Sequence, residues 1–515
     1  MSDFRVSRRE FVVGGAATLA LAACGGNAPA AQTSGGSAPA KLASSVTFAS
    51  QTISDTLDPH GTLSNSGFMM VRQLYDALVT FDEPGKTIVP QLATEWKRID
   101  PLTMEFKLRD DVKFANGEPF TSDAVVYNVD RIMRANDPLI AGGSRTRMGP
   151  LDTAEAVDKN TVRIKTKSPD PILINRLTTL FMVSPKFVKD GNDPKTKSGG
   201  SGSFNVTDFQ TTKAISLEAR DSWRGASTVQ TAKIVAIPEL AAFISALKTG
   251  EVDIAWNFQG DQLPGIKNDF NVGIQEGGSC NISSLIPGLV QAIDDKRVRT
   301  AINLAVNKDE LIKTVQGGVG TVAQGQLLSS GITGYNDAVK AFPFDPDKAK
   351  SLLKDAGFAS FDAPFVTSVP TLAIVQAIAG YLKAVGINLP VKQLEFPAFV
   401  QNLTQKTDSP LISWNTDYFH IRDFDTPGLR FAGLPPGQPH FKNDEMTRLY
   451  LAARQELDAT KRTDMIKQMS QIMYDEAACL FLFQRQFAVA YTKKIANLAL
   501  PYDTSVYLWK VQKAA

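Results

Sequence analysis

Cysteine and histidine are both scarce in this sequence, which has three of each among 515 residues. The three histidines, His60, His420 and His440, are far apart, and the chain has neither H-E-x-x-H nor a paired C-x-x-C motif. A zinc site built by the protein alone requires ligands at such spacings. We therefore expect no resident metal and no cofactor, although His420 alone suits a metal that arrives as a chelate.

The sequence also lacks an excess of charge of either sign. Its 55 basic and 53 acidic side chains give a net charge of +2, and the two kinds are interspersed along the chain. A nucleic-acid-binding protein presents a basic stripe that follows the phosphate backbone. The charge distribution therefore argues against nucleic acid as a partner.

Recognisable catalytic motifs are missing as well. The chain has no G-x-S-x-G nucleophile motif, and Lys248-Thr249-Gly250 lacks the Ser-Asp-Asn element that accompanies K-T-G in serine β-lactamases. Gly250 is better explained as the residue that ends a helix. We expect a protein that is not an enzyme, and a secreted hydrolase is the less favoured alternative.

The N-terminus is typical of an exported lipoprotein. Arg8-Arg9 precedes an apolar run from Phe11 to Ala23, whose 13 residues are too few to span a membrane but suit a signal peptide. The arginine pair resembles a twin-arginine export motif, and Leu21-Ala22-Ala23-Cys24 resembles a lipobox. We predict a signal peptide over residues 1–23, a lipid on Cys24, and a periplasmic or cell-surface location.

The next segment contains no charge and no large apolar side chain. Residues 25–40 read GGNAPAAQTSGGSAPA, a composition that buries too little surface to fold. We predict that residues 24–43 form a flexible tether. No later run reaches eighteen uninterrupted apolar residues, so we expect no further membrane span.

The rest of the chain alternates between helical and strand periodicity. Asn307 and Asp345 stand where helix caps are expected. Helices are predicted at 67–78, 238–249, 297–306, 371–385, 443–457 and 460–474, and strands at 45–49, 104–108, 161–165, 252–258 and 387–394. Such alternation favours an α/β protein with open, mostly parallel sheets, which bind ligands beyond the carboxyl ends of their strands.

Residues 414–430 form the densest mixture of aromatic, acidic and basic side chains. The segment reads WNTDYFHIRDFDTPGLR and has neither helical nor strand periodicity, so we predict a loop. Its aromatic rings and charges suit a zwitterionic ligand such as a peptide. A surface loop whose aromatic side chains insert into the core is the equal alternative.

Several blocks closely resemble the family 5 extracellular solute-binding proteins, which serve oligopeptide, dipeptide, nickel and opine importers. The most specific block, residues 89–132, reads VPQLATEWKRIDPLTMEFKLRDDVKFANGEPFTSDAVVYNVDRI. Three further blocks resemble the family in the same order, namely ALKTGEVDI at 246–254, DKRVRTAINLAVN at 295–307 and DPDKAKSLLKDAGF at 345–358. The resemblance extends from about Val46 to the C-terminus.

The resemblance implies a periplasmic-binding-protein-like α/β fold, in which two lobes close on a ligand and an extra domain is inserted. The implied first domain comprises residues 44–60, 185–282 and 477–515, the inserted second domain residues 61–184, and the third domain residues 283–476. The implied partners are a peptide or similar zwitterion, or alternatively an opine or metal chelate, and the permease and ATPase of an ABC importer. A monomer is expected.

The resemblance also implies candidate ligand residues. Asp417 of the segment Trp414-Asn415-Thr416-Asp417 matches the aspartate that pairs with a peptide α-amino group in related binders. Arg422 is expected either to meet a ligand carboxylate or to neutralise Asp423. The full set of candidates is Asp417, Trp414, Tyr418, Arg422, His420, Trp256 and Phe258. At the crossover, Gly200-Ser201-Gly202-Ser203 departs from the Gly-Thr-Gly-Pro that is frequent in the family.

The two remaining cysteines, Cys280 and Cys479, are implied to lie near two strands that cross between the first and third domains. A disulfide there would clamp the hinge and restrict closure. We favour the alternative of two separate buried thiols, because the sequence fixes no distance between them.

Overall fold

The computed structural model describes residues 43–515, with gaps at 63, 135, 137–139, 141–143, 259–262, 264, 369–370, 406–408, 418–419, 435–439 and 503–504. The predicted signal peptide, the lipidation site Cys24 and nearly all of the predicted tether lie outside these described residues. No helix in the described part is long and apolar enough to cross a membrane.

The largest sheet has eleven strands. Ten of them follow the order β17 (Val391–Leu394), β15 (Phe365–Ser368), β18 (Leu411–Asp417), β12 (Asn271–Leu285), β19 (Cys479–Tyr491), β11 (Ile254–Phe258), β1 (Ser45–Ser50), β10 (Thr231–Ala236), β9 (Ala214–Ala219) and β8 (Phe204–Gln210). The short β13 (Thr321–Val322) pairs with β19 outside this order.

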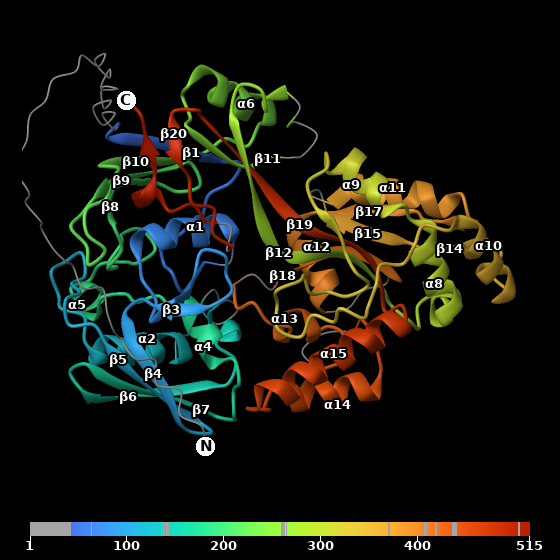
Figure 1. Cartoon of the computed structure of the whole chain (residues 1–515), viewed down its shortest axis with the longest axis horizontal. Coiled ribbons are helices and arrows are strands. Elements are labelled where there is room, and N and C mark those ends of the chain that lie inside the picture. The colour runs from blue at the N-terminus through green and yellow to red at the C-terminus, as the bar shows by residue number, and fades with distance from the viewer. Residues whose placement is uncertain are drawn as a thin grey trace, which may run out of the picture. The chain divides into compact units, whose positions relative to one another are not determined.

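Two long antiparallel strands, β12 and β19, run through the middle of this sheet (Figure 1). Their register shifts between Glu276 and Cys280, and such irregularities allow a ribbon to bend. Strand β11 pairs with the part of β19 that lies on one side of this shift. Strand β18 pairs with the part of β12 that lies on the other side. We call residues 43–276 and 486–515 the first lobe and residues 280–484 the second lobe.

The first lobe also contains a four-stranded antiparallel sheet. Its order is β4 (Ala93–Asp100), β5 (Thr103–Leu108), β7 (Thr161–Thr166) and β6 (Leu151–Asp158). Helix α2 (Ser122–Arg134) presents Val125, Val129 and Ile132 at helical spacing, and these side chains share one core with Phe106 and Ile164 of the sheet. This sheet and α2 thus bury their own apolar core.

The first lobe has a second apolar core, and the second lobe has a core of its own. In the first lobe, Phe48 of β1 and Phe68 of α1 (Asn65–Leu74) share a core with Val489 and Leu508, so the C-terminal segment packs against the N-terminal strand. In the second lobe, a core around the ends of β12 and β19 is covered by α8 (Lys296–Ala305), α10 (Pro346–Asp355), α11 (Leu372–Lys383), α14 (Asp444–Ala453) and α15 (Ala459–Asp475).

Further helices and short strand pairs complete the described part of the chain. They include the helices α5 (Pro185–Lys189), α6 (Leu240–Thr249), α7 (Gln291–Asp294), α9 (Lys308–Val315), α12 (Phe396–Thr404) and η5 (Leu508–Lys510). The short strand pairs are β2 (Val79–Phe81) with β3 (Ile88–Pro90), β14 (Phe361–Asp362) with β16 (Ile387–Asn388), and β20 (Ile495–Asn497) with β21 (Gln512–Lys513).

The expectation of mostly parallel sheets is wrong. In the large sheet only β1 with its two neighbours and β15 with its two neighbours pair in parallel among the described strands. The chain crosses between the lobes on β12 and returns on β19 in the opposite direction, which makes the central pairs antiparallel. The predicted strand at 387–394 is also interrupted, because it divides into β16 and β17 around Leu389-Pro390.

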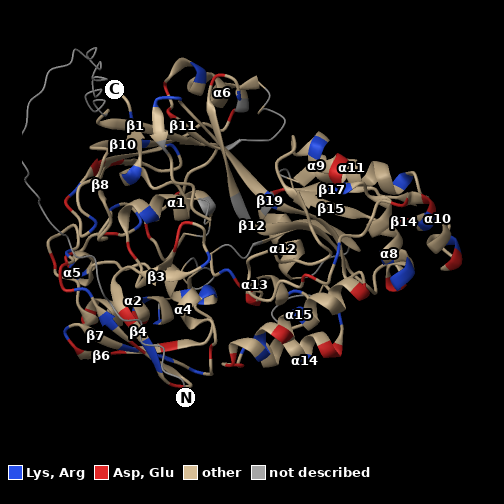
Figure 2. Ribbon diagram, viewed as in Figure 1, with Lys and Arg blue, Asp and Glu red and all other residues tan. Residues whose placement is uncertain are grey.

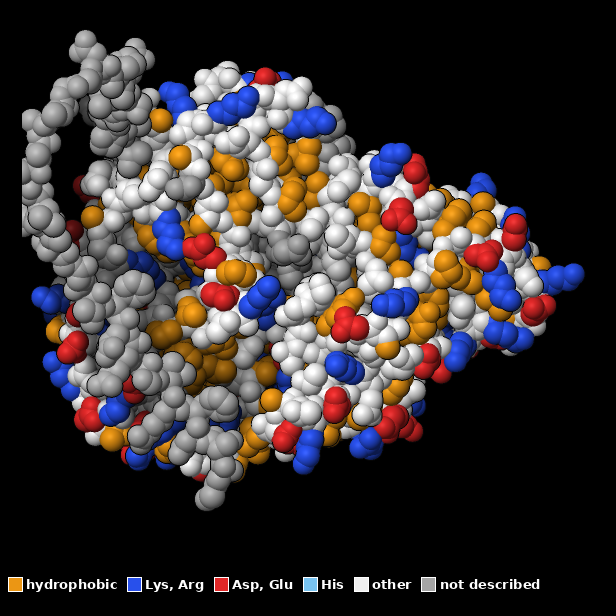
Figure 3. All heavy atoms as spheres, in the orientation of Figure 1, with side chains coloured by type: hydrophobic (Ala, Val, Ile, Leu, Met, Phe, Trp, Pro, Cys, Tyr) orange, Lys and Arg blue, Asp and Glu red, His pale blue; other side chains and the backbone are white. Residues whose placement is uncertain are grey.

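Charges of both signs are distributed over both lobes (Figure 2). On the face drawn in Figure 3, basic and acidic side chains are interspersed with small apolar patches. This distribution agrees with the near-zero net charge of the chain.

Candidate functional site

Strand β18 places the segment that begins at Trp414 next to the junction of the lobes. Asp417, its last residue, is opposite Ser279 of β12, beside the shift in register. The loop prediction for residues 414–430 is therefore wrong for Trp414–Asp417, which pair as a strand, and for Asp425–Gly428, which form the short helix α13. The side chain of Asp417 and all of Tyr418 lie outside the described part of the chain.

Trp414 is held by a chain of hydrogen bonds rather than by packing alone. Its Nε1 donates to Ser284 Oγ at 2.8 Å, and Ser284 Oγ lies 2.8 Å from Nδ1 of His440. Nε2 of His440 lies 3.1 Å from the Leu403 carbonyl, which only accepts, so Nε2 carries the proton and Nδ1 accepts from Ser284. Burial, aided by the charge of Arg430, lowers the pKa of His440 to about 4 and keeps it neutral.

The loop after β18 reaches the first lobe through His420. The His420 ring stacks on Phe68 of α1, with ring centroids 3.7 Å apart and planes at 28°. Burial, together with the charges of Arg147 and Arg72, lowers the pKa of His420 well below its usual value. His420 is therefore a neutral imidazole that joins the two lobes at an aromatic contact.

Two arginines of the first lobe surround this contact. The guanidinium carbon of Arg147 lies 5.0 Å from the Phe68 ring centroid, and that of the buried Arg72 lies 5.5 Å from the Phe181 ring centroid. Nη2 of Arg147 donates to the Thr62 carbonyl at 3.2 Å, whereas its buried Nε has no hydrogen-bond partner among the described atoms. Burial lowers the pKa of Arg147 to about 10.

These four side chains, Phe68, Arg72, Arg147 and His420, are called the interlobe cluster below. Two cations stand beside a neutral imidazole, and Arg147 has hydrogen bonds only to a carbonyl and a hydroxyl in the described part of the chain. Such a surrounding favours an anionic group, because a buried guanidinium gains most from a carboxylate or phosphate.

Arg422 lies on the same loop and also meets the first lobe. Its backbone φ is +49°, in the left-handed region, and its guanidinium carbon lies 4.9 Å from the Tyr502 ring centroid. Asp423 is held at two points by Arg462, at 2.7 and 2.8 Å, so its charge does not need Arg422. Arg462, rather than Arg422, therefore neutralises Asp423.

Trp256 is placed inside the first lobe. Its side chain is 4% exposed, donates from Nε1 to Gln275 Oε1 at 2.9 Å, and stacks on Phe487 with centroids 5.5 Å apart. The structure does not bring it to the interlobe cluster. The side chain of Phe258, at the end of β11, lies outside the described part of the chain.

The two cysteines are free and buried in this structure. They do lie on the crossing strands, Cys280 on β12 and Cys479 on β19, but Cys280 is opposite Gln484 and Cys479 is opposite Ser284. An offset of about four residues along a strand is roughly 13 Å, well beyond the span of a disulfide. The pairing described here favours two separate buried thiols over a bridge, and the state of the two cysteines stays a prediction.

Sequence reasoning missed the first-lobe half of the cluster. Phe68, Arg72 and Arg147 sit more than 270 residues before His420, and none belongs to a motif that singles it out. An apolar helix position predicts that Phe68 is buried but not that it meets another lobe. No signal within the sequence alone pairs these residues.

Comparison with known proteins identifies a family. The model of the bacterial extracellular solute-binding proteins, family 5, middle region, matches residues 87–425. Heme-binding protein A of Haemophilus influenzae is 27% identical over 504 residues, which cover 90% of this chain and 91% of that protein.

Solved structures share the fold. The periplasmic binding protein DppA of Helicobacter pylori, in complex with the peptide STSA, aligns with a TM-score of 0.77 at 21% identity, over 92% of this chain and 99% of that one. NikA of Brucella suis, in complex with Fe(III)-EDTA, aligns with a TM-score of 0.79 at 21% identity, over 91% of this chain and 99% of that one. The expected α/β fold of two lobes is therefore confirmed.

Proposed function

Because the chain belongs to the bacterial extracellular solute-binding proteins of family 5, we propose that it captures a small carboxylated solute for an ABC importer. The favoured ligand is a peptide or similar zwitterion, which is held between the lobes and handed to a membrane permease. The process contains no chemical step: the ligand stabilises the closed arrangement of the lobes, and the energy for transport comes from ATP hydrolysis elsewhere.

The interlobe cluster is the observation that carries this proposal. Arg147 offers a buried donor, Nε, without a partner among the described atoms, at a point where Phe68 and His420 bring the two lobes together. A ligand carboxylate there would contact both lobes at once and so favour closure. Asp417, at the end of β18, is proposed to bind the ammonium group at the other end of a zwitterion.

Export and anchoring complete the proposal. The sequence supports export through a twin-arginine signal peptide, cleavage before Cys24, and attachment of a lipid to that cysteine. The 16 or so small and polar residues that follow would then let the folded body meet a permease while the protein stays at the membrane.

Native mass spectrometry of the protein, purified from the envelope of its own host, tests these points together. We expect a mass that co-purifies with the wild-type protein and is lost on denaturation, and a polypeptide that begins at acylated Cys24. Arg147→Met should lower retention of that mass roughly tenfold to a hundredfold, as removal of a charge-assisted hydrogen bond predicts.

Arg145→Met is the matched control. It removes an equal charge from the same segment, but the Nε of Arg145 donates to the Ile132 carbonyl of α2. Equal retention by both variants would contradict the role of Arg147, and turnover of the bound molecule would instead revive the alternative of a secreted hydrolase.

An anionic metal chelate or an opine is the second candidate. It is favoured by His420, whose imidazole is neutral and lies near two arginines, so that it combines a metal ligand with charges that suit a carboxylated chelator. In this case the released mass would carry a metal isotope pattern, and His420→Ala would abolish its retention. A peptide mass would exclude this candidate.

A further inference from the structure

The loop of residues 420–425 is fastened to the first lobe beside the interlobe cluster. Helix α4 (Leu173–Arg176) and the turn η2 (Leu177–Thr179) of the first lobe provide the contacting side chains. Asn175 Nδ2 donates to the Ile421 carbonyl at 2.9 Å, and Arg176 Nη2 donates to Asp425 Oδ2 at 2.8 Å. The Thr178 hydroxyl lies 3.3 Å from the His420 carbonyl, although its one proton has a closer acceptor in the Asn175 carbonyl at 2.7 Å. The contact of Arg176 with Asp425 is an ion pair between the lobes.

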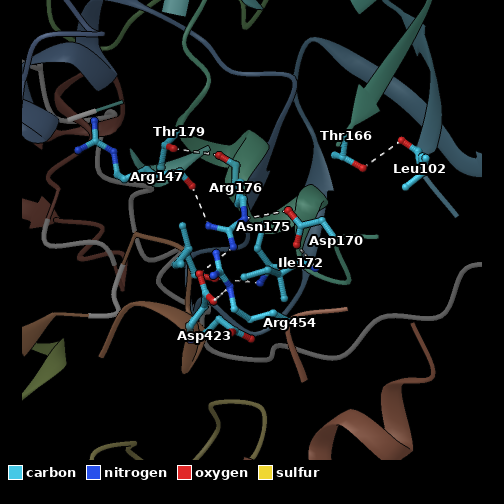
Figure 4. A network of polar contacts seen from close by, with 12 residues as sticks. Leu102, Arg147, Thr166, Asp170, Ile172, Asn175, Arg176, Thr179, Asp423 and Arg454 are labelled. Atoms are coloured by element: carbon cyan, nitrogen blue, oxygen red, sulfur yellow. Dashed lines mark hydrogen bonds and ion pairs between the residues drawn. The ribbon is translucent and has the colours of Figure 1, made fainter. Parts of the chain in front are cut away.

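Arg176 is the centre of this contact (Figure 4). Its side chain is buried, Nε donates to Asp170 Oδ2 at 2.9 Å, and Nη1 donates to the Arg147 carbonyl at 2.9 Å. Burial alone would lower the pKa of Arg176, but the two carboxylates outweigh it and raise the pKa, so the guanidinium stays charged. Arg176 thus contacts both the backbone of Arg147 in the interlobe cluster and a carboxylate of the opposite lobe.

The acidic residues on the second-lobe side of the Arg176–Asp425 contact also have arginine partners within their own lobe. Asp425 is also paired with Arg454 of its own lobe, at 2.9 Å, and its neighbour Asp423 is paired with Arg462. On the first-lobe side, Asp170 pairs with Arg176. When the lobes separate, each half of this network therefore keeps equal numbers of acids and arginines, and each of these six side chains retains a partner of opposite charge.

We infer that Arg176 is a positioning residue whose ion pair with Asp425 sets the balance between the open and closed arrangements of the lobes. It orients the Arg147 segment for the ligand and at the same time holds the loop that carries His420. A carboxylate that draws Arg147 into place would therefore favour the Arg176–Asp425 contact, and this contact would favour ligand binding. The inference rests on the proposed capture of a ligand between two lobes.

The chain offers a closely matched pair of variants. Asp425 faces one buried arginine, Arg176, and one more exposed cation, Arg454. Glu476 likewise faces a buried arginine, Arg299, and a more exposed Lys296, but all three lie within the second lobe. Asp425→Asn and Glu476→Gln therefore remove the same kind of charge, and only the first removes it from a contact between lobes.

Pulsed electron paramagnetic resonance provides the measurement, with spin labels on Lys159→Cys in the first lobe and Lys461→Cys in the second. Both positions are exposed, and the native Cys280 and Cys479 are buried; the mature chain also carries Cys24→Ser. No ligand is added. We expect Asp425→Asn to lower the ratio of closed to open populations at least tenfold, while Glu476→Gln leaves the distance distribution unchanged.

A second substitution tests whether the two side chains act as a pair. Combining Arg176→Met with Asp425→Asn should open the lobes no further than the more disruptive single change, because both remove the same contact. Coinciding distributions for Asp425→Asn and the wild type, or equal shifts for Asp425→Asn and Glu476→Gln, would overturn the inference. Since the distances are measured without ligand, failure of this test is distinct from failure to find a bound solute.

Discussion

Single histidines show how burial and hydrogen bonding together fix a protonation state. His60 lies at the centre of a buried network in which Arg131 Nη1 donates to its Nδ1 at 2.6 Å. Its Nε2 lies 2.8 Å from the Phe181 carbonyl and therefore carries the proton. A second proton on Nδ1 would face a guanidinium N–H. Burial and the charge of Arg131 accordingly lower the pKa of His60 to about 4, although Asp58 opposes them.

We predict that these histidines make the protein sensitive to acid. His60 and His440 have folded pKa values of about 4, against 6.5 when unfolded, so the unfolded chain binds more protons between these values. Stability is then fully present above pH 6.5 and falls as the pH drops towards 4, by about 3 kcal/mol for each histidine. Urea unfolding at a series of pH values from 7.5 to 4.5 measures this slope.

The control for this prediction is a side chain that cannot be protonated. His440→Gln keeps a donor and an acceptor, so its unfolding free energy should depend less on pH than that of the wild type in the same window. An unchanged slope in both His440→Gln and His60→Gln would show that other groups cause the acid sensitivity.

For single residues, the sequence predicts the chemical character of a side chain better than its position in the structure. It singles out Trp414 and His420 from the local density of aromatic and charged residues. The structure puts His420 at the interlobe contact, whereas Trp414 is bonded to Ser284 within the second lobe. The sequence cannot identify Arg147 as a site residue, because Arg147 and His420 come close only where the two lobes are in contact. For Trp256, the buried strand expected at 252–258 was the better indication, since its side chain is inside the core.

At the scale of single elements, local signals are reliable. Asn307 and Asp345 were expected to cap helices, and their side chains accept hydrogen bonds from the backbone N–H groups of Glu310 and Lys348. Cap and helix lie within one turn, so the sequence contains all the information. Strand pairing does not have this property: β12 and β19 begin more than 200 residues apart, and nothing within either strand specifies that they pair antiparallel.

At the crossover, residues 200–203, the course of the chain is fixed by close packing against the end of α1. A Cβ on Gly202 would lie 2.5 Å from the Gln73 carbonyl oxygen, and the Gly202 N–H donates to the Leu74 carbonyl at 2.9 Å. Ser201 Oγ donates to the buried Asp76 at 2.7 Å. The end of α1 is therefore packed directly on the crossover backbone, which fixes its course without the proline that is frequent in the family.

We predict opposite effects for two glycine-to-alanine changes. Gly202→Ala should destabilise the protein by about 1–3 kcal/mol, because the added methyl group would overlap backbone atoms that cannot move aside. Gly380→Ala, in the exposed interior of α11, meets no atom within 4 Å and should stabilise by about 0.5–1 kcal/mol. Urea midpoints of both variants measure the effects, and a neutral Gly202→Ala would contradict the close packing.

At the scale of the whole folded body, β12 and β19 are the elements that both lobes share. Each lobe buries its own core, and the shift in register between Glu276 and Cys280 divides the pairing of these strands into two segments. Motion of the lobes would therefore be absorbed at the shift, while the ladders on either side stay intact. A covalent bridge across these strands would oppose that motion, and the state of the two thiols is thus a property of the whole molecule.

We predict that Cys280 and Cys479 are unbridged and unreactive in the native protein. Both are fully buried, and burial raises the pKa of each thiol, so little thiolate is available for alkylation. In a chain with Cys24→Ser, iodoacetamide should modify neither cysteine under native conditions and both after denaturation without a reductant, as mass spectrometry would show. Modification that requires a reductant would establish a disulfide and a clamped hinge, and it would require β12 and β19 to pair in a different register from the one described.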